Sequence, residues 1–410
     1  MRMTVILWAL TGAAGLAMGA RDSCVECHSA LSGALQAPAV QMENDVHARR
    51  GLGCAACHGG DPSSDDPQVS MSRARGFTGK PNRLTIPKFC ARCHSDAAFM
   101  HRFQPQPRVD QYAQYMTSIH GKRIASGDAA AAVCTDCHGT HGVRAVKDPL
   151  SPVHPLRLPE TCGRCHADPQ HMAKYGIPTN QLAEFRKSVH WEALEKRGDL
   201  SAPSCASCHG NHGATPPGVA TVAAVCGTCH VLMQQLYDKS PHRPVFDAMG
   251  AAGCVVCHSN HAVLRTSPAM LAGPEAVCSR CHDATSAGGL AAAQIGASIQ
   301  KLNEALNRSR SILDEASKAG MEVSEAVMRT NDAAEALVKA RVAVHAFDPK
   351  AVEQPVQEGL AVAAETYQAG VDAMRERDRR RIGLGVSLIA ILITMAGLWF
   401  TIRRLESQPR

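Results

Sequence analysis

The sequence predicts a mainly α-helical protein with much irregular coil, in which a cysteine-rich region precedes a long antiparallel helical hairpin and one C-terminal transmembrane helix. Three observations predict this fold. All 18 cysteines of the 410-residue chain lie before residue 282. Residues 288–381 contain no cysteine and have apolar or small residues at helical spacing. Residues 382–402 form an uncharged apolar run that is long enough to cross a bilayer.

Every cysteine belongs to a Cys-x-x-Cys pair that is followed at once by a histidine, and there are nine such motifs. This order is typical of c-type haem attachment, because two thiols can bond to one porphyrin edge while the next imidazole reaches the iron. The predicted attachment residues are Cys24, Cys27, Cys54, Cys57, Cys90, Cys93, Cys134, Cys137, Cys162, Cys165, Cys205, Cys208, Cys226, Cys229, Cys254, Cys257, Cys278 and Cys281. The predicted proximal iron ligands are His28, His58, His94, His138, His166, His209, His230, His258 and His282.

Other uses of paired cysteines explain the pattern less well. Structural zinc takes four ligands, so it favours an even number of pairs and gives no reason for nine histidines at one offset. Neither a thioredoxin-like redox motif nor a disulfide framework requires the histidine. Aromatic residues are only 4% of the chain, and porphyrins would supply the missing apolar mass. The sequence therefore predicts nine covalently attached c-type haems, with short helices and loops wrapped on a haem stack over residues 21–287.

The first 20 residues are typical of a secretory signal peptide. One arginine precedes an apolar run, and small residues close the segment around Ala17 and Ala20. An uncleaved anchor is the alternative. Export agrees with the cysteine motifs, because c-type haem is attached on the outer side of the plasma membrane.

The apolar run at 382–402 predicts a single-pass protein of the inner membrane. Five arginines precede the run and two follow it, so charge alone would place the preceding side in the cytoplasm. The haem motifs require the opposite orientation, and the arginines can bind anionic headgroups instead. We therefore expect a periplasmic haem region and a cytoplasmic tail at 403–410.

The cysteine-rich region is an internal repeat. After a solitary first motif, the other eight motifs form four two-haem units. A histidine precedes each pair of motifs, usually as Ser-x-His. In the last three pairs another histidine follows three residues after the first motif histidine, whereas Asp61 stands at that position in the first pair. A fixed internal period is typical of a stacked array of similar units.

Histidines outside the motifs are candidates for the second axial ligand of each iron. Seven recur at repeat positions, and these are His47, His120, His141, His190, His212, His242 and His261. His345 and His101 are the candidates retained for the two remaining haems. His154, His171, Met100 and Met172 are alternatives that share no common offset in the repeat.

Residues 288–381 predict a helical hairpin stalk. A straight helix over 290–344 would be too long to pair with the helix that follows it, so we expect a break, a tilt or a path beside the haems, with Gly320 as the preferred break. Asp348 is the expected cap of the second helix, which continues into the membrane. The stalk is either a plain coiled coil or a surface for partner docking, including assembly into an oligomer.

The doubled motifs with Ser-x-His leaders and His-x-x-His spacing resemble multihaem cytochromes of the cytochrome c3-like and NapC/NirT-like group, over residues 24–282. The resemblance implies a periplasmic electron relay between the quinone pool and soluble or outer-membrane partners. The chain departs from the NapC/NirT type because it has nine motifs rather than four or five and a C-terminal anchor.

The expected function is an electron carrier rather than an enzyme. Its expected partners are a quinone-linked membrane complex and periplasmic or outer-membrane cytochromes. The formal charge of +6 does not indicate nucleic-acid binding, because haem propionates offset it and no basic stripe is present. The alternative is a multihaem reductase or oxidase of small nitrogen or sulfur compounds with one open haem site.

Overall fold

The computed structural model describes residues 22–216 and 218–406. The predicted signal peptide and the last four residues of the predicted tail lie outside these ranges. The chain divides into two compact units, Met1–Val219 and Ala220–Arg410, and each is described by itself. The described residues contain helices and coil but no β-strand, which confirms the prediction of a mainly helical fold.

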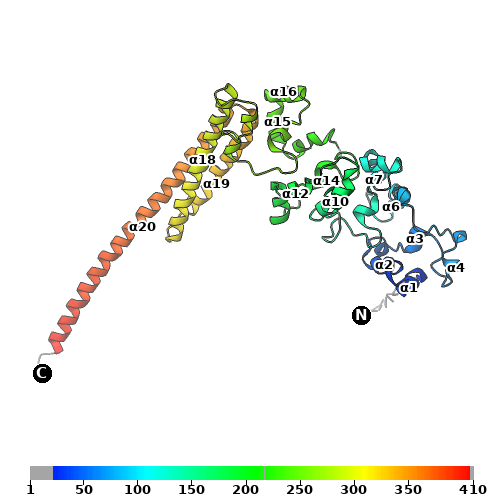
Figure 1. The fold of residues 1–410 in the computed structure, drawn as a ribbon. Helices are drawn as coiled ribbons and strands as arrows, with labels where there is room; N and C mark the ends of the chain where they lie inside the picture. The colour runs from blue at the N-terminus through cyan, green and yellow to red at the C-terminus, as the bar shows by residue number, and fades with distance from the viewer. Residues whose placement is uncertain (1–21, 217, 407–410) are drawn as a thin grey trace, which may run out of the picture. The chain divides into compact units, whose positions relative to one another are not determined.

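The first unit consists of short helices joined by turns and irregular coil (Figure 1). Its α-helices are α1 (Ser23–Ser29), α2 (Ala37–Gln41), α3 (Cys54–His58), α4 (Pro67–Ser70), α5 (Ile86–His94), α6 (Ala97–His101), α7 (Gln111–Thr117), α8 (Ile119–Ala125), α9 (Cys134–His138), α10 (Leu158–His166), α11 (Pro169–Ala173), α12 (Gln181–Phe185), α13 (Val189–Trp191) and α14 (Cys205–His209). Short 3-10 segments occupy 33–35, 42–44, 48–50, 73–75 and 83–85, and a π-helix occupies 192–196.

Among the described residues of this unit, the apolar cluster of buried side chains is small for a region of nearly 200 residues. It joins Ile124, Ala131 and Val133. Large apolar side chains such as Leu35, Val40 and Leu150 are more than half exposed. A chain that buries so little apolar surface of its own needs another apolar body to fold around, and six of the nine motifs lie in this unit.

The second unit begins with the last three motifs and ends in long helices. Its elements are a 3-10 segment (Val222–Thr228), α15 (Val231–Asp238), α16 (His242–Ala248), α17 (Gly253–His258), 3-10 segments at Pro268–Met270 and Cys278–Arg280, α18 (Ala287–Lys318), α19 (Ser324–Ala343), a 3-10 turn (Val344–Ala346) and α20 (Pro349–Glu406).

The stalk has three helices rather than the two of the expected hairpin. Helix α18 ends at Lys318, and the chain reverses through Gly320, whose φ of 77° lies in the left-handed region that favours glycine. Helix α19 returns antiparallel, and α20 then runs parallel to α18 (Figure 1). The break at Gly320 therefore produces a full reversal. The prediction of one antiparallel pair was wrong, because a single break in a segment this long leaves two helices before the turn.

The stalk core is built from a stripe on each helix with alternating steps of three and four residues. The buried residues of α18 include Ile295, Ile299, Leu302, Leu306, Ser309, Leu313 and Ala316. Those of α20 are Val352, Val356, Gly359, Ala363, Thr366 and Gly370. This spacing keeps one face of each helix toward its partners. The apolar stripes are thus covered within one chain.

Small residues on α20 let the helices approach closely. A Cβ atom on Gly359 would lie 2.8 Å from a methyl carbon of Leu302 and 2.9 Å from the Cβ of Ala336. Two turns further along, the hydroxyls of Ser309 and Thr366 form a buried hydrogen bond of 2.7 Å, so neither polar group is left unpaired in the core.

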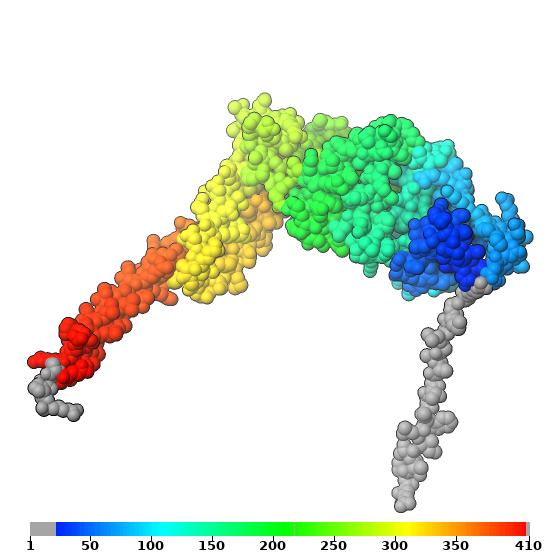
Figure 2. All heavy atoms as spheres, turned by 60° about the horizontal axis from the view of Figure 1, so that its bottom comes forward, coloured from blue at the N-terminus to red at the C-terminus, as the bar shows by residue number. Residues whose placement is uncertain are grey.

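Helix α20 continues as a single rod beyond the bundle (Figure 2). The side chain of Asp348 accepts a hydrogen bond of 3.0 Å from the backbone N–H of Lys350 at its start, which is the cap that the sequence predicted. Within the described residues, α20 is the one helix that is long and apolar enough to cross a membrane. Its apolar residues beyond Arg381 are exposed.

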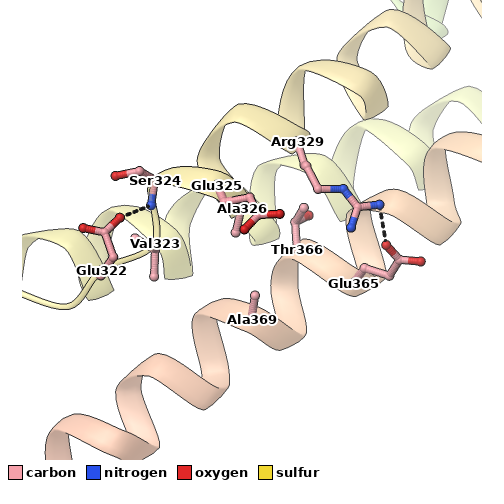
Figure 3. A pocket seen from close by; sticks show the side chains of 9 residues that line it. All are labelled: Glu322, Val323, Ser324, Glu325, Ala326, Arg329, Glu365, Thr366 and Ala369. Carbon is pink, nitrogen blue, oxygen red and sulfur yellow. Dashed lines mark hydrogen bonds and ion pairs between the residues drawn. The ribbon is translucent and has the colours of Figure 1, made fainter.

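A cavity of about 340 Å³ opens beside the α18–α19 turn, between the start of α19 and the middle of α20 (Figure 3). Arg329 and Glu365 form an ion pair of 2.6 Å at its edge, and the side chain of Glu322 accepts a hydrogen bond from the N–H of Ser324. None of the nine residues that line it is a cysteine or a histidine. The cavity therefore belongs to the stalk and not to the haem motifs.

Candidate haem sites

Most motifs form a single helical turn that ends at the motif histidine. Helices α3, α9 and α14 run from the first motif cysteine to the histidine, and α5, α10 and α17 end at the histidine as well. Residues i, i+3 and i+4 of a helix share one face. Both thiols and the imidazole therefore point to one side of the turn, as attachment to one porphyrin requires.

A residue with positive φ follows the first motif of each two-haem unit. Two of these residues are Gly139, with φ of 83°, and Ser259, with φ of 64°. This conformation ends the helix directly after the motif histidine. The histidine three residues later is thereby turned away from the preceding motif and can face a different one.

The serine of the Ser-x-His leaders is a helix cap. The Oγ atom of Ser118 accepts a hydrogen bond of 3.1 Å from the N–H of Gly121, and that of Ser188 accepts one of 3.1 Å from the N–H of Trp191. Each serine thus begins the short helix that carries the leader histidine in its first turn. Before His47 the corresponding residue is Asp45, whose Oδ1 accepts a hydrogen bond from the N–H of His47.

Six motif histidines have a second imidazole ring opposite them. The pairs, with the separation of their ring centres, are His94 and His47 at 6.0 Å, His58 and His141 at 6.1 Å, His166 and His120 at 6.1 Å, His138 and His212 at 6.1 Å, His282 and His242 at 5.9 Å, and His258 and His345 at 6.0 Å. All six separations agree to within 0.2 Å.

This spacing fits one metal ion between each pair of rings. A metal–imidazole bond of about 2.0 Å on both sides places the two coordinating nitrogens about 4 Å apart. A centre-to-centre distance near 6 Å then leaves about 1 Å for the radius of each ring. The residues present therefore fit haem iron.

Five of the six pairs follow two relations within the repeat. The leader histidine of a unit faces the second motif of its own unit, as His120 faces His166. The histidine that follows a first motif faces the first motif of the preceding unit, as His141 faces His58 and His212 faces His138. The second and third two-haem units thus each supply a ring to the unit before them.

The last two-haem unit has no unit after it, and the stalk supplies the missing ring. His345, in the 3-10 turn between α19 and α20, faces His258. Phe347, two residues later, lies with its ring centre 4.0 Å from that of His242. The stalk turn therefore contacts the sites of both motifs in the last unit. The structure brings His345, but not His101, to a motif histidine.

The other candidates do not stand opposite a motif histidine in this way. His101 is exposed at the end of α6. His154 is 5% exposed, and its Nδ1 faces the N–H of Leu156. His171 packs against Tyr175, and Met172 is buried while Met100 is half-buried. His190, His209, His230 and His261 hold the same repeat positions as members of the six pairs, and their predicted roles rest on the sequence.

Several rings have one nitrogen held by a hydrogen bond, which leaves the other nitrogen for a metal. Nδ1 of His28 lies 2.9 Å from the carbonyl of Leu35, and Nδ1 of His58 lies 3.0 Å from that of Gly79. Nδ1 of His345 lies 3.0 Å from the carbonyl of Val342. Such contacts set the tautomer and the orientation of a metal-binding imidazole.

Burial favours the neutral form of nine of the twelve paired rings. Desolvation is the main cause that lowers the pKa of the following histidines, and neighbouring histidines lower it further for most of them: His94, His120, His138, His141, His166, His212, His242, His258 and His345. A neutral imidazole has the lone pair that a metal ligand needs.

The cysteines of successive motifs are neighbours. In the first of the two compact units the neighbouring thiols are Cys24 and Cys54, Cys57 and Cys93, Cys90 and Cys134, Cys137 and Cys165, and Cys162 and Cys205. In the second compact unit the neighbouring thiols are Cys226 and Cys254, and Cys257 and Cys278. The motifs are therefore adjacent in chain order, from the first to the sixth and from the seventh to the ninth.

Three arginines that the sequence analysis overlooked tie motifs together. Arg92 donates a hydrogen bond of 2.8 Å to the backbone carbonyl of Cys57, and Arg164 donates one to the backbone carbonyl of Asp136. Arg280 lies 3.5 Å from the backbone carbonyl of Val256. Each arginine belongs to the second motif of a unit and reaches the first. The recurring Cys-x-Arg-Cys-His text of three second motifs is the signal that could have identified them.

Asp45 is the most buried carboxylate near a candidate ligand, with 1% of its surface exposed. Its Oδ1 lies 2.9 Å from Nδ1 of His47 and accepts from the N–H of the same residue, while Oδ2 accepts a bond of 2.7 Å from the N–H of Val143. Burial alone would raise the pKa of Asp45, but these backbone N–H donors and the His47 ring hold it below its usual value.

Replacing Asp45 by Asn should raise the reduction potential of the haem attached at Cys90 and Cys93. A carboxylate that accepts the Nδ1 proton makes the imidazole a stronger electron donor and so stabilises the oxidised iron. Loss of one such contact changes metal affinity by at least about tenfold, which for one electron is about 60 mV. A spectroelectrochemical titration of the full-length protein measures the change.

Asp199→Asn is the matched control for this substitution. Asp199 is exposed, and its carboxylate accepts hydrogen bonds from the N–H and the hydroxyl of Ser201 rather than from a histidine. If both variants leave all potentials unchanged, Asp45 does not tune a haem. A shift of one potential in the Asp45 variant alone is the expected result.

Comparison with known proteins places this arrangement in a family. The model of the cytochrome c3 family matches residues 46–167 and 199–283, about half of the chain. The model described as cytochrome c554 and c-prime matches residues 11–59. The C-type polyheme cytochrome OmcC of Geobacter sulfurreducens is 24% identical over 226 residues, which cover 48% of this chain and 27% of the relative.

A second relative gives a similar result. The C-type polyheme cytochrome OmcB of the same species is 24% identical over 258 residues, covering 61% of this chain and 26% of the relative. The chain thus spans about a quarter of the length of these curated relatives. No solved structure shows a significant match. On the repeated motifs and on the family match over half of its length, the chain belongs to the cytochrome c3 family of multihaem c-type cytochromes, which bind haem c covalently.

Proposed function

We propose that the chain is a membrane-anchored, periplasmic nonahaem cytochrome c that relays electrons between a quinone-linked partner of the inner membrane and periplasmic or outer-membrane acceptors. The adjacency of the attachment cysteines in chain order is the observation that carries this proposal. Electron tunnelling falls steeply with distance, so a relay needs redox groups in near contact. If each pair of thiols holds one porphyrin edge, neighbouring thiols would bring the edges of successive porphyrins side by side.

The paired imidazoles support a relay rather than substrate turnover. Haem iron accepts and releases one electron when it is bound. His138 with His212, and His166 with His120, would hold such an iron from both sides. This leaves no position for a substrate, so these pairs would suit electron transfer.

The arginines between motifs would hold this spacing. Arg92 and Arg164 each bind a carbonyl in the first motif of their own unit. Each cross-link fixes one attachment helix against the next, and the guanidinium group places a positive charge beside both haems. A nearby positive charge favours the reduced state of each.

The exposed apolar part of α20 would anchor the relay. Trp399 lies near its end, with the guanidinium of Arg403 at 4.5 Å from the centre of its ring. Aromatic and basic residues of this kind are enriched at the bilayer interface. The arginines before residue 382 would contact headgroups at the periplasmic surface, and the stalk would carry the last haem sites above it.

Reduction of the haems by respiring membranes tests the proposal. Membranes that contain the full-length holoprotein should reduce its haems when a respiratory donor is added, as followed by the α-band absorbance. A periplasmic fraction added afterwards should reoxidise them. Intact-mass measurement of the same preparation should give the polypeptide plus nine haems.

The control variant replaces Ile391 and Leu392 by Arg. Each arginine costs about 2.5–3.5 kcal/mol at the centre of a membrane helix, so this double variant should keep its haems but leave the membrane fraction and lose reduction by the respiratory donor. The proposal is wrong if the wild-type haems are all attached and reducible by dithionite, yet remain oxidised in respiring membranes.

A further inference from the structure

The first motif differs from the others in what faces its histidine. All 20 histidines of the chain lie in the described residues. Among the described residues, no second imidazole ring lies opposite His28, whose Nδ1 binds the carbonyl of Leu35. That hydrogen bond leaves Nε2 for iron, as in the paired histidines. The proximal side of this site is therefore complete, and its distal side is unlike that of the six pairs.

The rule of the repeat identifies the residue that replaces the missing ring. The histidine three residues after the first motif of a two-haem unit faces the first motif of the preceding unit, as His141 faces His58. The corresponding position after Cys54–His58 is Asp61, and the motif before it is that of His28. A carboxylate thus stands where the repeat would supply the second ligand.

Backbone contacts place the Asp61 segment beside the first motif. The N–H of Ser23, at the start of α1, donates a hydrogen bond of 2.8 Å to the carbonyl of Pro62. The thiols of Cys24 and Cys54 are neighbours. The first and second motifs are therefore arranged like successive motifs elsewhere, and the absence of a second ring comes from the residue at position 61 rather than from a different path of the chain.

The side chain of Asp61 is held by other partners. Its Oδ1 accepts bonds from the N–H and the hydroxyl of Ser63, at 3.1 and 2.6 Å, and its Oδ2 lies 4.0 Å from Nε of Arg75. The serine hydrogen bonds are the main cause that lowers its pKa, with Arg75 adding to the effect. A carboxylate that is oriented by Ser63 and Arg75 is a poor substitute for an imidazole.

We propose that the haem held by Cys24, Cys27 and His28 has one axial position open to a small exogenous inorganic ligand, whereas the other haems are closed by a second histidine. This goes beyond electron relay, because it makes the first haem a binding site at one end of the series. The ligand class is a small molecule or ion that bonds to iron through one donor atom. Asp61 and Arg75 would offer it a hydrogen-bond acceptor and a donor.

The test uses cyanide as the probe on the full-length oxidised holoprotein. The wild type should have one high-spin haem among nine by electron paramagnetic resonance, and cyanide should convert it to low spin with a stoichiometry of one per chain. Asp61→His restores the ring that the repeat omits, so the high-spin signal and cyanide binding should both disappear. Counting haems by intact mass separates this outcome from a failure of haem attachment.

Two variants guard against an effect of misfolding. Asp61→Asn removes the charge without adding a ligand and should keep both the high-spin signal and cyanide binding. Asp65→His adds a histidine four residues along the same loop and should behave like the wild type. A wild-type protein whose nine haems are all low spin and do not bind cyanide overturns the proposal, as does an Asp61→His variant that binds cyanide as the wild type does.

Discussion

Replacing His345 by Ala should convert the haem attached at Cys254 and Cys257 from low spin to high spin. The ring of His345 lies 6.0 Å from that of His258 and is nearly parallel to it, at 26°. Removal of this ring leaves one axial position without a protein ligand. Electron paramagnetic resonance should show one more high-spin haem per chain, and exogenous imidazole should return it to low spin.

The matched control is His101→Ala. His101 is exposed and lies at the end of a short helix, so its loss should leave every haem unchanged. The assignment of His345 is wrong if the two variants have the same spectra. It is also wrong if the His345 variant keeps the wild-type spin state and imidazole has no effect on it.

Replacing Leu302 by Ala should destabilise the stalk by about 2–5 kcal/mol. Leu302 is 0% exposed and packs against the backbone of Gly359 at the level where all three helices meet. The glycine leaves no side chain that could move into the space, so the cavity would persist. Hydrogen exchange of the backbone amides of α18 and α19 in the full-length protein measures the loss, because it reports on the stalk separately from the haem region.

Leu290→Ala is the matched control on the same helix. Leu290 is 59% exposed, so its truncation creates no cavity and should change protection little. Equal loss of protection in both variants would contradict the packing described for the stalk. Loss confined to the Leu302 variant supports it, and haem spectra that stay constant in both would show that the stalk core is separate from the haem sites.

Local patterns in the sequence predicted much of the candidate sites. The Cys-x-x-Cys-His motifs, the Ser-x-His leaders and the His-x-x-His spacing are readable because each depends on one helical turn or one tight turn of the chain. The cap at Asp348 and a break at Gly320 follow from local residue chemistry as well. Residues whose partners lie far along the chain were harder to identify. Arg83, which bonds to Asp136, and Asp45, which bonds to Val143, have no local signature that names those partners.

The number of stalk helices could not be obtained from the periodic pattern alone. The stripes of α18 and α19 have the same period whether the chain continues or reverses at Gly320. Only packing against α20 selects the reversal, because α20 buries its small residues against both helices at once. The pairing of histidines could not be predicted for the same reason, because the order of the motifs along the chain does not determine which histidine rings lie opposite each other.

By itself the sequence determined the chemistry of this protein: which residues can attach haem, how often the unit repeats, and that a long apolar segment ends the chain. These depend on residue types at fixed short spacings. Only the tertiary structure decided that His141 and His212 each face the first motif of the preceding two-haem unit, that His345 of the stalk faces His258, and that the segment of Asp61 lies beside the motif of His28. Those relations join residues far apart in the chain, and they exist only once the positive-φ turns and the stalk reversal have brought the side chains together.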